Sequence, residues 1–182
     1  RDCLLSRGLG DVYKRQAQRT LIRCQLLVQR IARAIGNPSE LARVVRNLDR
    51  LSDMLCGVID MAELVRHAHP DQGWANAAND AYEYLCNYMN VLNTHTELYD
   101  ALRCVMETKD IYHSLSQEAQ AVAHIFMRDF EKSGIHLPPH ERNRFVELSD
   151  QIMILGRAFL QDMSTGTSDT LSLIHISEPT RQ

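Results

Sequence analysis

The chain has 182 residues, of which 45% are hydrophobic, and its formal net charge is -3. This length and composition suit one globular domain with its own core. No block of lysine and arginine interleaves with aromatic residues, so nothing supports a nucleic-acid face, and no apolar run approaches the roughly 20 residues of a membrane span.

The five cysteines are widely spaced, odd in number and without a CxxC pair: Cys3, Cys24, Cys56, Cys86 and Cys104. This pattern argues against a disulfide framework and against a thiolate zinc site. Cys56, Cys86 and Cys104 lie among apolar helical residues, and we expect them to be small core residues. Such cysteines fit a reducing compartment, the cytosol or the mitochondrial matrix.

The two ends differ from the interior. Residues 1–16 (RDCLLSRGLGDVYKRQ) and 170–182 (ending in LSLIHISEPTRQ) resemble peptides translated from sequencing-adapter DNA. We expect both to be adapter-derived artefacts, which makes residues 17–169 the domain and the chain a fragment. A mitochondrial transit peptide is the alternative for the first piece, which has three arginines and a lysine, but Asp2, Asp11 and the glycines of GLG weaken it.

Helical spacing begins at Ala17–Ile35, which Gly36-Asn37-Pro38 should end. The longest regular stretch follows, from Arg43 to Pro70, where apolar residues recur at steps of three and four over about seven turns. Ser39 is its expected N-cap, and His69-Pro70 should end it because the residue before a proline is pushed out of helical space. We expect its apolar stripe, with Leu55 and Ile59 at its middle, to form the core.

Four more helices are predicted by the same spacing. They are Trp74–Leu92, Glu97–Thr108, a stretch from Ser114 or Ser116 to Ser133-Gly134, and Glu141–Asp162. Asn93–His95 should be a break or a kink, with Thr96 as the next cap, and Ile135–Leu137 should be extended. The apolar residues of the last helix are Phe145, Leu148, Ile152, Leu155, Phe159 and Leu160. Sustained period-two alternation is absent, so the fold class is all-α, a bundle of five to six mostly antiparallel helices.

One motif comes close to a zinc site. His140-Glu141 begins like the HExxH helix of metalloproteases, which needs histidines at i and i+4 to face one metal. Arg144 occupies the second position, so a helix surface is the better interpretation. His67 and His69 are two residues apart and point to different faces of a helix. The other histidines are isolated in sequence (His95, His113, His124 and His136), and we predict no catalytic, cofactor-binding or metal-binding residue in this chain.

Three long stretches carry a family resemblance: LDRLSDMLCGVIDMAELVRHAHPD (48–71), NVLNTHTELYDAL (90–102) and FMRDFEKSGIHLP (126–138). They resemble the N-terminal helical region of a mitochondrial, fungal type of peptidase in the thimet oligopeptidase family of zinc metallopeptidases. The similarity covers roughly Ala17 to Asp162. It is specific because long, unusual strings agree in order.

The resemblance implies a full-length zinc metalloendopeptidase of the mitochondrial matrix, which removes N-terminal octapeptides from imported precursor proteins. Its zinc would be held by an HExxH helix and a downstream glutamate in a C-terminal catalytic half that this chain lacks. The fragment would then be one inactive wall of the substrate channel, with uncovered apolar surface. The alternative is a free-standing helical interaction module without activity. A reading frame that continues past Asp169 into HExxH favours the first, and a natural stop codon there favours the second.

Overall fold

The computed structural model describes the chain from Cys3 to Thr165, with side chains from Arg15 to Met163 except Gln161. The described residues form eight helices and no strand, which confirms the all-α class. The helices are α1 (Cys3–Ala32), α2 (Pro38–Leu41), α3 (Val44–Ala68), α4 (Gln72–Asn93), α5 (Thr96–Glu107), α6 (Lys109–Ser114), α7 (Gln117–Lys132) and α8 (Pro139–Thr165). Within this part of the chain, no helix has the length and apolar character to cross a membrane.

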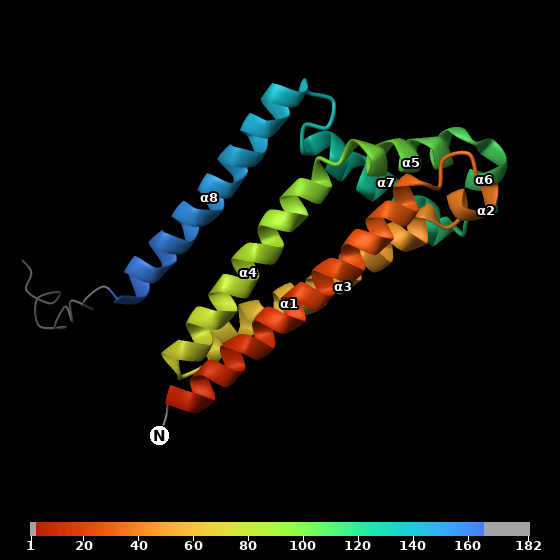
Figure 1. Ribbon diagram of the computed structural model, residues 1–182. Coiled ribbons are helices and arrows are strands. Elements are labelled where there is room, and N and C mark those ends of the chain that lie inside the picture. Colours follow the sequence, from red (N-terminus) through yellow and green to blue (C-terminus); the bar gives the residue numbers. More distant parts are fainter. Residues whose placement is uncertain (1–2, 166–182) are drawn as a thin grey trace, which may run out of the picture.

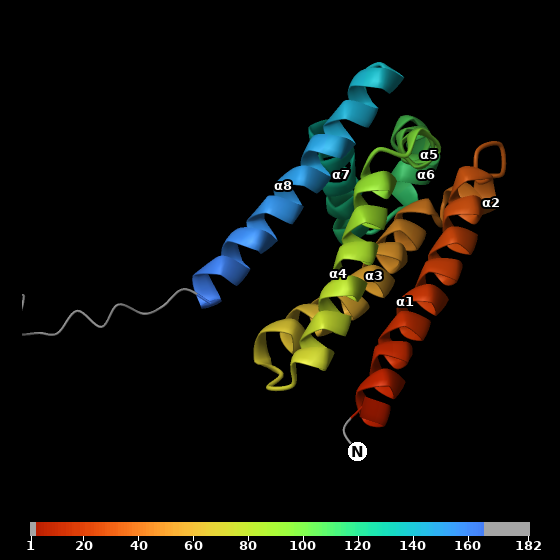
Figure 2. The same ribbon diagram turned by 60° about the vertical axis from the view of Figure 1, so that its left-hand side comes forward.

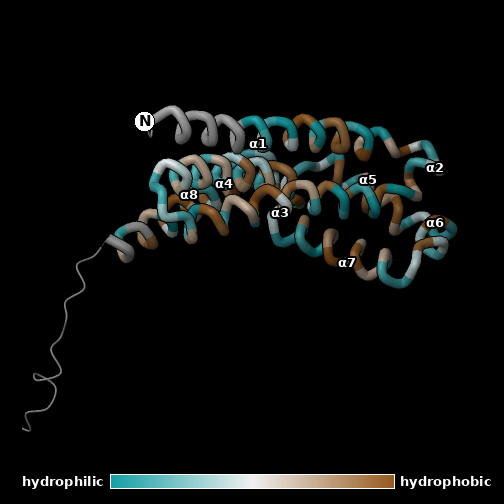
Figure 3. The backbone as a smooth tube through the Cα atoms, turned by 90° about the horizontal axis from the view of Figure 1, so that it is seen from below, coloured by the Kyte–Doolittle hydropathy of each residue, from teal (hydrophilic) through white to brown (hydrophobic). Residues whose placement is uncertain are grey.

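Three long helices, α1, α3 and α4, lie side by side and form the body of the molecule (Figures 1 and 2). The shorter helices α2, α5, α6 and α7 gather at one end of this body. The last helix, α8, runs alongside α4 and has α4 as its main neighbour. Seen from below, α1 and α7 flank the layer that contains α3 (Figure 3).

The central helix α3 has more buried side chains than any other element in the described residues. They follow the predicted stripe: Val44, Val45, Leu48, Leu51, Leu55, Val58, Ile59 and Ala62. Leu55 is 2% exposed and Ile59 is 8% exposed, so their predicted place in the core is confirmed. The helix ends where expected, because His69 before Pro70 has extended backbone angles (φ -81°, ψ 130°).

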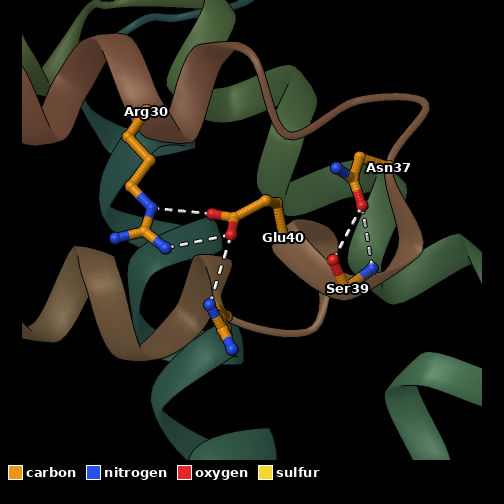
Figure 4. A network of polar contacts seen from close by, with 5 residues as sticks. Arg30, Asn37, Ser39 and Glu40 are labelled. Atoms are coloured by element: carbon orange, nitrogen blue, oxygen red, sulfur yellow. Dashed lines mark hydrogen bonds and ion pairs between the residues drawn. The ribbon is translucent and has the colours of Figure 1, made fainter.

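The start of this region differs from the prediction. Ser39 does not cap α3, because it lies inside the short helix α2, which Asn37 caps. The Asn37 side-chain oxygen accepts hydrogen bonds from the Ser39 backbone N–H (3.2 Å) and hydroxyl (2.9 Å; Figure 4). Pro38 occupies the first helical turn, where a missing N–H costs nothing, so the preceding asparagine is the residue placed to cap.

The break after α4 is a true helix end. The Thr94 hydroxyl donates back to the carbonyls of Asn90 and Val91, both at 3.2 Å, and closes α4. Thr96 was predicted to be the cap of the next helix, and this is wrong: it is the first residue of α5. The N-cap is His95, which makes no side-chain capping bond. Helix α6 was not predicted because its six residues are too few to show a period.

A Schellman motif ends α7. Ser116 caps its start, one of the two predicted positions, and Gly134 has a left-handed φ of 76° at its end. The Ile135 N–H donates to the Phe130 carbonyl at 3.2 Å and the Gly134 N–H to the Glu131 carbonyl at 3.1 Å. Residues 135–137 are therefore a turn, and the predicted extended segment is wrong.

The first helix begins earlier than expected, at Cys3 instead of Ala17. The residues between contain no proline, and an existing helix can extend through them at one backbone bond per residue. Cys86 is buried as predicted, whereas Cys56 and Cys104 are only half-buried. Cys24, for which no position was predicted, is fully buried between α1 and the rest of the body.

Candidate docking surface

Helix α8 presents its apolar residues to solvent. All six apolar residues named from the sequence are exposed, and Met163 extends their row. Four of the six and Met163 are spaced at steps of three and four, and we call these five residues the α8 stripe: Leu148, Ile152, Leu155, Phe159 and Met163. Ile152 is 70% exposed and Leu155 is 68% exposed. A contiguous apolar row of this kind marks an interaction surface, because isolated exposed apolar side chains are ordinary but a row along one helix is not.

Polar contacts hold α8 to the body. The Asn90 side-chain amide donates to the Asp150 carboxylate at 2.7 Å, and the Arg157 guanidinium donates to the Glu83 carboxylate at 2.7 Å. Asp150 and Arg157 are seven residues apart, so they lie on the same face of α8. Met153, on the same side, packs partly buried against the core. The face turned to α4 is therefore mainly polar, and the α8 stripe points elsewhere.

An apolar recess lies among the helices of the body. It has a volume of about 330 Å³ and is lined by residues of α3, α4, α5 and α7, among them Leu55, Met89 and Phe126. Asp129 and Lys132 also line it. The recess is within the size range of pockets that accept a small ligand or an apolar side chain of a partner.

The zinc-like sequence lies on an exposed helix surface. His140 and Glu141 are in the first turn of α8, with His140 Nε2 3.7 Å from Glu141 Oε1 and the His140 side chain 80% exposed. Arg144 Nη1 is 3.3 Å from Glu147 Oε2. A guanidinium paired to a carboxylate cannot supply the second metal ligand, so these residues do not fit a zinc site.

The other histidines do not converge. His67 Nε2 lies 3.3 Å from Glu63 Oε1, while His69 stacks on Trp74 with ring centroids 4.6 Å apart. His124 Nε2 is 3.0 Å from the Tyr112 hydroxyl. In the part of the chain with described side chains, no three histidine, cysteine, aspartate or glutamate residues are grouped closely enough to hold a metal ion.

The buried cysteine of α1 is a poor nucleophile. Burial raises the pKa of the Cys24 thiol from 9.0 to about 11, and burial likewise raises the pKa of Tyr88 on α4 to about 12. The thiolate is the reactive form of cysteine, so Cys24 is inert near neutral pH. It acts as a core residue.

Comparison with known proteins matches this chain to curated fungal proteins. It is 99% identical over 155 residues to the mitochondrial intermediate peptidase of Malassezia globosa, a match that covers 85% of this chain and 19% of the relative. The chain is similar to mitochondrial intermediate peptidases. The protein of that name from Mycosarcoma maydis is 65% identical over 155 residues (81% of this chain, 17% of the relative), and that from Coprinopsis cinerea is 62% identical over 149 residues (82% and 19%).

The relatives' name confirms the resemblance found in the sequence. The chain spans about a fifth of the length of these mitochondrial intermediate peptidases. No protein-family model matches the chain, and no solved structure does either. Four of the five residues of the α8 stripe were visible in the sequence as an apolar period, and the resemblance implied an uncovered apolar surface, but no signal located that surface on α8.

Proposed function

We propose that this chain is a non-catalytic part of a mitochondrial intermediate peptidase, which as a whole is a zinc metalloendopeptidase that removes N-terminal octapeptides from imported precursors in the mitochondrial matrix. The observation that carries this proposal is the 99% identity over 85% of the chain to a protein of that name. The match covers 85% of the chain and leaves the rest unmatched, as adapter-derived residues 1–16 and 170–182 would require.

The α8 stripe packs, in this proposal, against the rest of the peptidase and places α8 in one wall of its substrate channel. Its five apolar side chains are exposed along one face of the helix. Fully burying a side chain of this type is worth about 1.5–3 kcal/mol, so a partner that covers the row gains substantial binding energy. The relatives have about four fifths of their length outside the match, enough chain to supply that partner.

The zinc of the whole peptidase is proposed to lie outside this chain. A catalytic zinc site needs three protein ligands and an open position for water. His140 lacks its i+4 partner, because Arg144 stands there and pairs with Glu147. We therefore expect the chain alone to show no sub-micromolar zinc binding by calorimetry, and His140→Ala to leave the titration unchanged.

Reconstitution tests the proposal. The chain and the separately purified remainder of the Malassezia globosa relative are assayed alone and mixed, with a quenched precursor peptide that contains the octapeptide. We expect chelator-sensitive cleavage by the mixture and no cleavage by this chain. Cleavage by the remainder that is unchanged when the chain is added would instead favour a free-standing helical interaction module.

A further inference from the structure

The outward face of α1 carries a row of arginines. Arg19, Arg23, Arg30 and Arg33 are all exposed, and at 100° per residue they fall within about 80° on the helix circumference. Ile22 and Leu26 lie on the same face and are also exposed. We call these six residues the basic face of α1. It is the reverse of the side that contributes Cys24 and Ile31 to the core.

The segment that carries the basic face has a positive net charge, whereas the rest of the sequence has a negative one. Residues 17–36 contain four arginines and no aspartate or glutamate. The remainder of the chain has 16 of the 20 lysines and arginines and all 23 acidic residues, so its net charge is -7 while the whole chain is at -3. The sequence therefore concentrates positive charge in this segment relative to the rest, and such an asymmetry favours approach to an anionic surface.

Among the ion pairs of the described residues, one carboxylate contacts the basic face, and two arginines share it. Glu40 accepts from Arg30 at 2.7 and 2.9 Å and from Arg43 at 3.2 Å (Figure 4). The hydrogen bonds from Arg30, above all, lower the pKa of Glu40 and keep it ionised. One anion between two cations leaves a positive surplus. Arg19, Arg23 and Arg33 form no ion pair with any residue of the described part.

The basic face and the α8 stripe belong to opposite sides of the molecule. Helices α1 and α8 are separated by α3 and α4 in Figure 2. The two surfaces therefore share no residue and no helix. The two surfaces can act independently, and they can be altered independently.

We propose that the basic face of α1 binds a membrane surface that carries anionic lipid headgroups. The row from Arg19 to Arg33 is about 21 Å long at 1.5 Å per residue, and it is a convex helix surface, which suits a flat and laterally continuous array of phosphates. Guanidinium groups bind phosphate oxygens through paired hydrogen bonds. Ile22 and Leu26, set between the arginines, enter the boundary between headgroups and acyl chains.

Vesicle co-sedimentation of the 182-residue chain tests this. Partition coefficients are measured on two kinds of vesicle: phosphatidylcholine with about a third phosphatidylglycerol, and phosphatidylcholine alone. The ratio of the first coefficient to the second cancels the contribution of adsorption through apolar surfaces. We expect a ratio well above one that falls as salt rises. At about 1 kcal/mol per arginine, the Arg19→Gln/Arg23→Gln/Arg33→Gln variant lowers it roughly a hundredfold.

Two further variants sharpen the test, and circular dichroism verifies that each folds. Arg103→Gln/Arg128→Gln/Arg144→Gln removes three exposed arginines from other helices and should keep the ratio within a few fold of the parent. Ile22→Ser/Leu26→Ser should weaken partitioning without changing its salt dependence. A ratio near one for the parent, an equal loss from the matched triple variant, or tighter binding to soluble polyglutamate than to vesicles would each overturn the proposal.

Discussion

Helices α3 and α8 have the same kind of sequence and opposite surroundings. Both are long, and both space their apolar residues at steps of three and four. In α3 that row is buried between α1, α4 and α7, whereas in α8 it faces solvent and a polar face meets the body. Periodicity therefore predicts a helix with one apolar face. Whether that face belongs to a core or to an interface depends on the neighbours that cover it.

Replacing leucine by alanine at one buried and one exposed position tests this difference between α3 and α8 most strongly. Leu55→Ala on α3 should lower the free energy of unfolding by about 2–5 kcal/mol, because it leaves a cavity in a packed core. Leu155→Ala on α8 removes the same atoms from solvent and should change it by less than about 0.5 kcal/mol. Denaturant unfolding measures both. Equal losses would mean that α8 is packed as tightly as α3.

High pH should weaken the contact of α1 with α4. Unfolded Cys24 and Tyr88 ionise near 9.0 and 10.0, but burial raises their folded pKa values to about 11 and about 12. The folded state therefore favours the protonated forms of both groups. Their contribution to the free energy of unfolding is complete below pH 9 and is lost between pH 9 and 12, by about 2–3 kcal/mol per group.

Thermal melts across this pH range measure that loss. The double variant Cys24→Ala/Tyr88→Phe should flatten the alkaline decline. Tyr84→Phe, at an exposed position of the same helix, serves as the matched control and should leave it unchanged. A decline that survives the double variant would place the alkaline-sensitive groups elsewhere.

The attachment of α8 should break without unfolding the body. Arg157→Ala removes the ion pair to Glu83, a partly exposed contact worth about 1 kcal/mol, and leaves the α3 core intact. Hydrogen exchange should show faster exchange in α8 with unchanged protection in α3. Arg144→Ala, whose partner Glu147 is on α8 itself, should leave α8 exchange unchanged. Equal acceleration of α3 would show that the two helices unfold as one unit.

The smallest effect is on dye binding. The chain should bind a hydrophobic dye and self-associate weakly, because the α8 stripe is uncovered. Ile152→Ser/Leu155→Ser should reduce both with little change in stability. Met61→Ser/Leu64→Ser, on exposed apolar positions of α3, is the control and should reduce them less. Equal reductions from the two double variants would mean that the α8 stripe is not the main surface for dye binding and self-association.

Much of the fold was predictable because helical periodicity and strong stop signals are local. His69-Pro70 and Gly134 end their helices through their own backbone preferences. The caps were less predictable: Ser39 and Thr96 have suitable side chains, but Asn37 and His95 occupy the cap positions that the chain path creates. The family resemblance implied some uncovered apolar surface, but its location on α8 could not be predicted, since burial depends on contacts from other parts of a protein.

We propose that the α8 stripe is a docking face for the rest of a mitochondrial intermediate peptidase. Calorimetric titration of this chain with the remainder of the Malassezia globosa relative tests it directly. We expect a one-to-one complex that Ile152→Asp/Leu155→Asp weakens at least about a hundredfold, as the loss of two buried apolar side chains requires, and that Met61→Asp/Leu64→Asp leaves intact. No complex, or a complex equally sensitive to both pairs, would contradict the claim.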